Sequence, residues 1–538
     1  MAIAQVEDEE IGAWNPGIKS TLPPEYLPLS TMFRPENVFT SVETASELSD
    51  FTGLSIYQVV RIRPQRLVVH ELLIRVSADI FVSDGSKYED LGVNFRNVVA
   101  RILRDYIEPQ MTEIVNRYSQ LEQQVQTVVA HELDISLYAK PVDKKNNRPS
   151  FSLAGLFGSG RKTNTAHSIE TAEERDQRIL TKWSEQVGTA KERLARAVFR
   201  ALVKTGNAIV NKHGRLIGDK ALLVSLATGL VCNDYGSEMI GEFIQPLIQQ
   251  AAIKEAYRIL PAQINPVVIN VKGAAAAGKS TMRPLQKKHT ENIGINWDDF
   301  ALISPDIWRK YLLDYASLGQ ATKYAGPLAG DEIPFVDQKF DQYISNKAKQ
   351  GRLSHMLIDR FRFNSFTRHT DTEAGSNLLT RFGHTIYLVF LVTPPEATVE
   401  RAWIRGLQVG RYKSVDDLLD HNIEAFRGIP DLFFTWALHR DKIVYYEFLD
   451  NSVAYGQKPR TIAFGLNGEM YILDFKSMFD IVRYTKINIE AHSPAEVYPN
   501  SSDMDAAMNT GFLLKCVRKI PRINFVDVGS KQIYACMK

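Results

Sequence analysis

The segment at residues 266–281, PVVINVKGAAAAGKST, constrains the fold of this chain more than any other. A run of branched apolar residues stops at a glycine, four alanines follow, and Gly-Lys-Ser-Thr completes the pattern G-x-x-x-x-G-K-[ST]. A buried strand precedes the pattern, and a helical stretch from about Ser280 to His289 follows it, with Pro284 as a candidate kink. A phosphate-binding P-loop is expected in this context.

The residue types of this loop suit a polyphosphate. Glycines allow backbone dihedrals that are closed to other residues, so consecutive N–H groups can point inward at the phosphates. The helix N-terminus adds a positive dipole end, Lys279 reaches the β- and γ-phosphates, and Ser280 ligates Mg²⁺. The predicted nucleotide-binding residues are Gly273, Ala274, Ala275, Ala276, Ala277, Gly278, Lys279, Ser280 and Thr281. The alternative is a small-residue turn that only packs a strand on a helix.

Length and composition limit the classes of protein to consider. A chain of 538 residues suggests about three domains, and 44% hydrophobic with 23% charged residues is typical of a soluble protein. A net charge of +2 gives no overall electrostatic signal for a nucleic acid or a membrane, so neither is expected as a partner. The acidic start lacks the order of a signal peptide, and three scattered cysteines fit a reducing compartment. We expect a cytoplasmic protein, although an effector secreted without a cleaved signal has the same features.

The first half of the chain is expected to be mainly helical. An N-terminal helical domain is predicted over 1–138, beginning with a proline-rich extended arm at 1–30 and containing a buried helix or strand pair at 67–82, where His70 and Glu71 form a buried pair. Residues 139–172 are rich in Gly, Ser and Asn and predict a flexible linker. A helical region follows over 173–259, with Trp183 in its core.

Strands and helices alternate over 260–455. A buried strand is predicted before the P-loop, and a short apolar strand followed by a helix is predicted in 300–315. Further strands are predicted at 355–363, where the apolar run stops at Asp359, at 385–395 and at 443–449. The alternation indicates an α/β fold of the P-loop NTPase type, a doubly wound and mainly parallel sheet with its ligand at the carboxyl ends of the strands. The extension at 456–538 contains β-structure, because Asn467-Gly468 between two apolar runs is a strong hairpin signal.

Charged residues downstream of the P-loop distinguish a kinase from a nucleotide switch. Asp306 follows a strand and is a candidate base for an acceptor hydroxyl, and Asp359 ends another strand as a metal-binding carboxylate does. Arg401, Arg405 and Arg411 come in one helix and loop, as in a lid over a phosphoryl group. The alternatives are a helix cap for Asp306, a structural carboxylate for Asp359 and surface positions for the arginines.

Over about 260–455 the chain resembles the zeta toxins. The shared features are the P-loop, Asp306-Ile307-Trp308-Arg309 after a strand, Ile358-Asp359-Arg360-Phe361 at a strand end, Thr398-Val399-Glu400-Arg401 on the lid helix, a second lid arginine at Arg411, and the helical stretch 415–433. The chain departs from the family in lacking His-Pro after the Asp306 block and in having Asp-Arg-Phe in place of Glu-Gly-Thr. These departures leave the acceptor open.

The resemblance implies a kinase that transfers the γ-phosphoryl group of ATP to a hydroxyl. It implies Asp306 as the base, Lys279 on the nucleotide, Ser280 and Asp359 on Mg²⁺, and Arg401 and Arg411 on the transferred group. The implied acceptor is a nucleotide sugar such as UDP-N-acetylglucosamine or a nicotinamide dinucleotide, and the implied role is that of a toxin or effector. Two alternatives stay open, a polynucleotide kinase and a nucleotide-gated interaction protein without phosphotransfer.

The residues ahead of the core are long enough to regulate it. Such a kinase is restrained by an antitoxin in the resembling family, and about 250 residues with a flexible linker precede the core here. They are expected to inhibit the site in cis, since the linker keeps them at high local concentration, to direct the protein to a partner or a host, or to serve as a structural scaffold.

Overall fold

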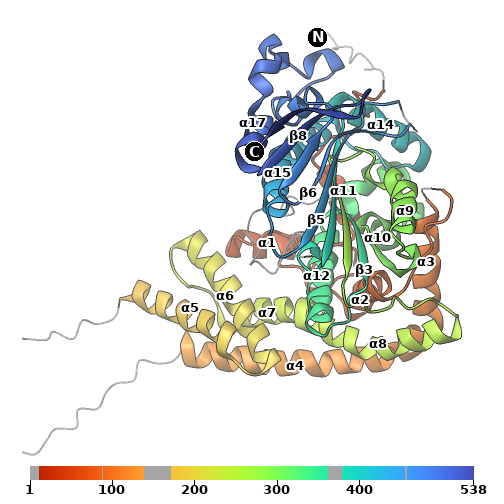
Figure 1. Ribbon diagram of the computed structural model, residues 1–538. Coiled ribbons are helices and arrows are strands. Elements are labelled where there is room, and N and C mark those ends of the chain that lie inside the picture. Colours follow the sequence, from red (N-terminus) through yellow and green to blue (C-terminus); the bar gives the residue numbers. More distant parts are fainter. Residues whose placement is uncertain (1–10, 88, 139–170, 361–378, 455–456) are drawn as a thin grey trace, which may run out of the picture. The chain divides into compact units, whose positions relative to one another are not determined.

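The computed structural model of this protein describes residues 11–87, 89–138, 171–360, 379–454 and 457–538 (Figure 1). Residues 139–170 of the expected linker, including its GLFGSGRK sequence at 155–162, lie outside the described residues, while Thr171 and Ala172 form the start of a helix. The chain has an α/β fold with a helical N-terminal region over 24–254, followed by a mixed and mainly parallel sheet with helices. The predicted fold class is therefore confirmed.

In the described part of the chain, nine strands form one sheet in the order β2-β3-β1-β4-β5-β6-β7-β8-β9. Their bounds are β1 Val267–Lys272, β2 Phe300–Ile303, β3 His355–Asp359, β4 Thr385–Val392, β5 Ile443–Asp450, β6 Arg460–Leu466, β7 Glu469–Ile472, β8 Arg522–Asp527 and β9 Gln532–Met537. Strands β2, β3, β1, β4 and β5 run parallel, which brings their carboxyl ends to one edge. The strand β1 lies inside this parallel part, between β3 and β4.

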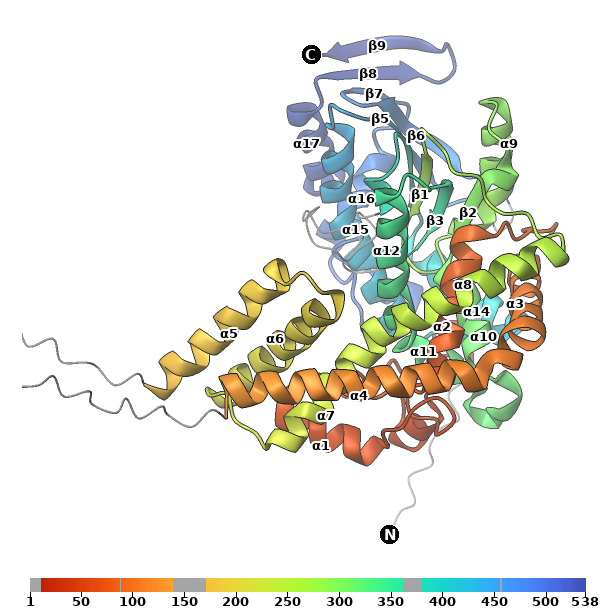
Figure 2. The same ribbon diagram turned by 90° about the horizontal axis from the view of Figure 1, so that it is seen from below.

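The C-terminal strands belong to this same sheet. The strand β6 pairs antiparallel with β5, and the predicted hairpin at Asn467 joins β6 to β7, with Asn467 at φ 47°. The strand β8 then pairs parallel with β7 and antiparallel with β9, which is the edge strand in Figure 2. The β-containing extension thus adds mainly antiparallel strands to the edge of the parallel part of the sheet.

Helices cover both faces of the parallel strands (Figure 1). Their bounds are α9 Arg283–Asn292, α10 Pro305–Leu312, α11 Ala325–Gly330, α12 Ile333–Lys349, α14 Pro395–Val409, α15 Val415–Ala437, α16 Asp480–Arg483 and α17 Gly511–Lys519. On one face, Phe433 of α15 contacts Phe390 and Phe448 edge-on, and Phe512 of α17 joins them. On the other face, His289 of α9 contacts Tyr387. These contacts seat the helices on the sheet.

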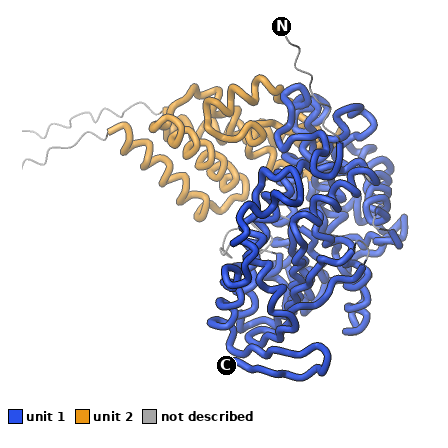
Figure 3. Tube along the Cα trace, turned by 90° about the horizontal axis from the view of Figure 1, so that it is seen from above, with its two compact units in different colours: residues 1–37, 68–111, 241–538 blue, residues 38–67, 112–240 orange. Residues whose placement is uncertain are grey.

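The described residues cluster into two compact units (Figure 3). One unit contains the sheet and combines residues 11–37, 68–111 and 241–538, including most of α2 (Pro64–Asp79), α3 (Asp90–Ile102) and most of α8 (Ser237–Lys254). The other unit is helical and combines 38–67 with 112–240. It holds α1 Val42–Thr52, α5 Ala172–Thr189, α6 Arg193–His213, α7 Lys220–Val231 and nearly all of α4 Met111–Ser136.

Several local predictions in the helical region can be checked. Trp183 is buried and donates its indole N–H to Glu132, 2.9 Å away, which confirms its place in a core. A π-helical turn at Leu103–Ile107 and a 3₁₀ turn at Glu108–Gln110, which contains Pro109, separate α3 from α4. His70 and Glu71 are both buried, as predicted. His70 contacts Glu332 at 2.6 Å, and Glu71 pairs with Arg75.

The helix after the P-loop begins later than predicted. Residues Lys279–Met282 form a 3₁₀ turn, and α9 begins at Arg283. Pro284 therefore lies in the first turn of α9, where its missing N–H has no partner to lose, and the predicted kink is not needed. Within the described residues, no helix is both long and apolar enough to cross a membrane.

Candidate functional site

The P-loop lies between β1 and the 3₁₀ turn at Lys279. Gly278 adopts a left-handed conformation with φ 94°, and a Cβ there would lie 2.9 Å from the Asn451 side-chain nitrogen. Gly273 is needed for a different reason, since its φ is not positive but a Cβ would lie 3.1 Å from the Leu391 Cβ. Ala276 is the other P-loop residue with a positive φ, 58°. The expectation that both glycines adopt restricted dihedrals is thus correct for Gly278 alone.

Two side chains at the ends of neighbouring strands anchor this loop. The carbonyl oxygen of Ala277 accepts hydrogen bonds from the Asn451 amide at 2.7 Å and from the Thr393 hydroxyl at 3.0 Å. Thr393 directly follows β4 and Asn451 directly follows β5. Sequence reasoning missed both residues, although each is a polar residue at the end of an apolar run. They fix the loop against the sheet before any ligand arrives.

The ammonium group of Lys279 is held inside the loop. It donates to the carbonyl oxygens of Gly273 at 3.1 Å and Ala274 at 2.9 Å. Burial lowers the pKa of Lys279, while the carboxylates of Asp359 and Asp306 act in the opposite direction. A cation in a desolvated loop between two carboxylates is suited to attract the oxygens of a phosphate.

Ser280 and Asp359, the two predicted metal ligands, contact each other. The Ser280 hydroxyl donates to Asp359 Oδ2 at 2.5 Å, because Asp359 ends β3 in register with Val271 of the adjacent β1. The guanidinium of Arg283 lies 3.8 Å from the same carboxylate oxygen. No group of three or more His, Cys, Asp or Glu side chains within the described ranges could hold a metal. A hydroxyl and a carboxylate are oxygen ligands that suit Mg²⁺ when phosphate and water complete its shell.

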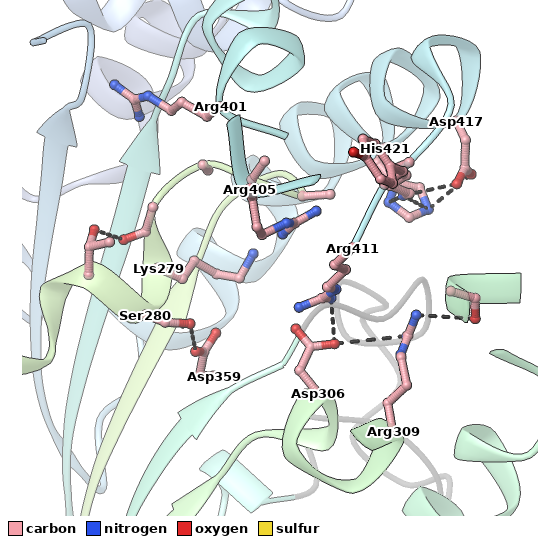
Figure 4. A pocket seen from close by; sticks show the side chains of 18 of the residues that line it. Lys279, Ser280, Asp306, Arg309, Asp359, Arg401, Arg405, Arg411, Asp417 and His421 are labelled. Carbon is pink, nitrogen blue, oxygen red and sulfur yellow. Dashed lines mark hydrogen bonds and ion pairs between the residues drawn. The ribbon is translucent and has the colours of Figure 1, made fainter. Parts of the chain in front are cut away.

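Asp306 lies in the first turn of α10, directly after β2. Its carboxylate accepts a hydrogen bond from Arg411 at 2.7 Å and lies 3.8 Å from Arg309 (Figure 4). Burial acts to raise the pKa of Asp306, but the guanidinium groups of Arg411 and then Arg309 and Arg405 hold it far below its usual range. The side chain is nevertheless 46% exposed. Asp306 is therefore ionised and accessible from the cavity.

The lid arginines take different positions. Arg401 donates to the backbone carbonyls of Asn451 and Val453 at 2.8 and 2.9 Å, and its guanidinium points away from Asp306 (Figure 4). Arg405 lies on the side of Lys279 and Arg411, and its charge influences the pKa of both Lys279 and Asp306. The sequence indicated Arg405 as a lid arginine together with Arg401 and Arg411, but the resemblance implied roles for Arg401 and Arg411 alone.

These residues line one cavity of about 920 Å³ in the unit that contains the sheet. Its P-loop side comprises residues 275–281, while Gly273 and Ala274 are buried beneath the lining. The opposite side includes Asp306 and Arg309 on α10 and Asp331 after α11, and the N-terminal arm contributes residues 18–20. The volume is at the upper end of the range for small-molecule pockets.

A second charged group lies at the start of α15, beside the lid loop. Lys413 lies 3.1 Å from Asp417 and 2.5 Å from the Nδ1 atom of His421. Burial lowers the pKa of Lys413 to about 8, and burial together with the Lys413 charge lowers the pKa of His421 to about 3. All three side chains line the cavity. Lys413, Asp417 and His421 are spaced four residues apart in the sequence, and this spacing was not used to predict the site.

No protein-family model, curated protein or solved structure matches this chain. Of the motif residues that follow the P-loop, Asp306, Arg309, Asp359, Arg401 and Arg411 line the cavity.

Proposed function

We propose that this cavity is the catalytic site of an ATP-dependent kinase that transfers the γ-phosphoryl group to a hydroxyl of a small metabolite. The observation that carries the proposal is the position of Asp306. This carboxylate comes from a separate element, α10, and shares the cavity with Lys279 of the P-loop and with Arg405 and Arg411. A protein that only binds a nucleotide has no use for a base on the acceptor side.

Each residue has a role that its position supports. The P-loop backbone and Lys279 bind the β- and γ-phosphates, in place of the loop carbonyls that Lys279 contacts now. Arg405 and Arg411 face the cavity and would stabilise the transferred group, with Arg401 holding the end of β5 nearby. Ser280 and Asp359 would hold Mg²⁺, which when bound supplies neutralising charge for the phosphates.

The pairing of Arg411 with Asp306 would couple nucleotide binding to proton transfer from the acceptor hydroxyl. While the guanidinium lies 2.7 Å away, the lowered pKa makes Asp306 a weak base. A γ-phosphate would attract Arg411 away, and the pKa of Asp306 would then rise toward its ordinary value. The carboxylate becomes a better acceptor of the hydroxyl proton only when the nucleotide is in place. This order would limit proton transfer without phosphoryl transfer.

The acceptor proposed here is a nucleotide sugar such as UDP-N-acetylglucosamine or a nicotinamide dinucleotide. The size of the cavity is compatible with such a molecule beside ATP. We further propose a cytoplasmic site of action and a role as a toxin or effector, in line with the zeta-toxin motifs. Neither a nucleic acid nor a membrane is part of the proposal.

Labelled ATP tests the proposed activity. The full-length protein is incubated with [γ-³²P]ATP, Mg²⁺ and a metabolite extract, and with the two named acceptors separately. Wild-type protein should transfer label to a small molecule, and Lys279→Ala should reduce the rate by orders of magnitude because it removes the cation on the phosphates. Far-UV circular dichroism of the variant controls for folding. Equal transfer by wild type and Lys279→Ala would exclude this cavity as the catalytic site.

A further inference from the structure

The N-terminal arm spans two sides of the cavity. At one end, Ala13 and Trp14 pack against a buried cluster that includes Val399 and Ala402 of α14. The Trp14 indole N–H also donates to Glu400 at 3.1 Å. A few residues later Ser20 contacts Asp416 at the start of α15. Burial acts to raise the pKa of Asp416, but a hydrogen bond with the Ser20 side chain helps to lower it. The arm is thus attached to the elements that flank Arg411.

The next part of the arm is attached to the opposite side. Ile18, Leu22, Tyr26 and Leu29 pack against the apolar cluster between α10 and α11, which comprises Leu313, Leu318, Ala321, Tyr324, Ala325, Leu328 and Ala329. Lys323 donates to the carbonyl oxygen of Gly17 at 2.9 Å. The Thr31 backbone N–H donates to Leu328 at 2.9 Å. This side carries Asp306 and Arg309, so the arm connects the lid to the acceptor side.

The middle of the arm forms a wall of the cavity and does not fill it. Ile18, Lys19 and Ser20 line the cavity, which keeps its volume of about 920 Å³ with the arm in place. A segment that blocked the site would occupy that space. The arrangement is the one expected of an element that holds two walls together.

We propose that residues 11–31 act as a strap that positions the lid arginines over the P-loop, with Trp14 and Ser20 as positioning residues. This inference rests on the proposed function of the cavity. Because the strap joins α14 and α15 to the α10–α11 side, it keeps the loop that carries Arg411 beside the cavity, so that this arginine can move from Asp306 to a γ-phosphate without further ordering of the lid loop. Holding groups in their working geometry before the substrate binds reduces the entropic cost of reaching the transition state.

The test uses full-length Trp14→Ala, Ser20→Ala and the double variant. Release of a fluorescent ATP analogue is followed by stopped flow, and hydrogen exchange is measured over residues 11–31 and 395–414. The double variant should release the nucleotide about tenfold faster, and exchange should rise in the lid as well as in the arm. Trp14→Phe should behave closer to wild type, since it keeps the ring packing and loses only the hydrogen bond to Glu400.

Ile11→Ala is the matched control, because Ile11 is in the same arm but is 67% exposed and lines no part of the cavity. It should leave release and lid exchange unchanged. If the double variant folds and its nucleotide release rate and lid exchange equal those of wild type, residues 11–31 do not position the lid arginines. If its turnover rises instead, the arm restrains catalysis and the positioning role is overturned. If wild type binds no nucleotide, the proposed function fails, whereas lid exchange still tests the strap.

Discussion

Gly278→Ala separates the conformation of the P-loop from its charge. A Cβ at this position faces two costs. The left-handed φ of 94° costs a non-glycine residue about 1–2 kcal/mol. The new methyl group would also lie 2.9 Å from the Asn451 amide nitrogen, which must move and weaken its 2.7 Å bond to Ala277, at a cost of about 1 kcal/mol. The sum is about 2–3 kcal/mol, and it destabilises mainly the loop conformation that binds phosphate.

This cost should appear as weaker nucleotide binding. By the free-energy relation for binding, 2–3 kcal/mol corresponds to a Kd for an ATP analogue that is roughly 30- to 150-fold higher. Isothermal titration calorimetry measures it directly. Gly294→Ala is the matched control, since Gly294 also has positive φ, 75°, but a Cβ there meets nothing within 4 Å. If Gly278→Ala bound the analogue as tightly as wild type, this loop conformation would not be the one that binds phosphate.

Two further predictions concern pH. Burial and then the charge of Asp420 raise the pKa of Glu424 to about 8, and its carboxyl oxygens have no hydrogen-bond partner in the described structure. The carboxyl group of Glu424 ionises near pH 4.5 in the unfolded chain, so the stability of the wild type should fall as pH rises from 4.5 through about 8. The apparent Tm of Glu424→Gln should therefore increase relative to that of the wild type between pH 5 and 8.5. A difference in Tm that stayed constant over this range would refute the raised pKa. For Asp306, whose pKa Arg411 lowers against the effect of burial, the stabilisation is present near neutral pH and is lost as pH falls below about 4. The Tm gap between wild type and Arg411→Gln should therefore be smaller at pH 3.5 than at pH 6, and a gap that widened on acidification would contradict the ion pair.

Much of the parallel sheet was predictable because its strands are continuous apolar runs. Strands at Val267, Phe300, His355, Thr385 and Ile443 begin within a residue or two of the predicted positions. β1 and β2 are buried at every position, and such strands are mainly apolar because both faces are covered, whereas β4 and β5 have less buried residues at alternate positions near their starts. The hairpin at Asn467 was equally clear, since its turn needs a residue that tolerates positive φ.

The contacts that complete the site were not predictable from local pattern. Asn451 and Thr393 anchor the P-loop from 174 and 116 residues away, and no sequence period relates them to Ala277. His70 contacts Glu332, 262 residues away. The place of the arm on the cavity depends on the same kind of long-range packing. Periodicity predicts which face of an element is buried, but not which partner buries it.

The central claim is that a base for the acceptor stands beside a nucleotide site, and Asp306→Asn tests it most directly. The substitution keeps the shape of the side chain and removes its charge and basicity. Binding of an ATP analogue and turnover of ATP with acceptor are measured on the same full-length preparation. The proposed role of Asp306 as the base predicts that the variant binds the ATP analogue within a few-fold of wild type and that its turnover of ATP falls by about 10²-fold or more. Binding and turnover that both equalled the wild-type values, or that were lost together with the fold, would contradict it.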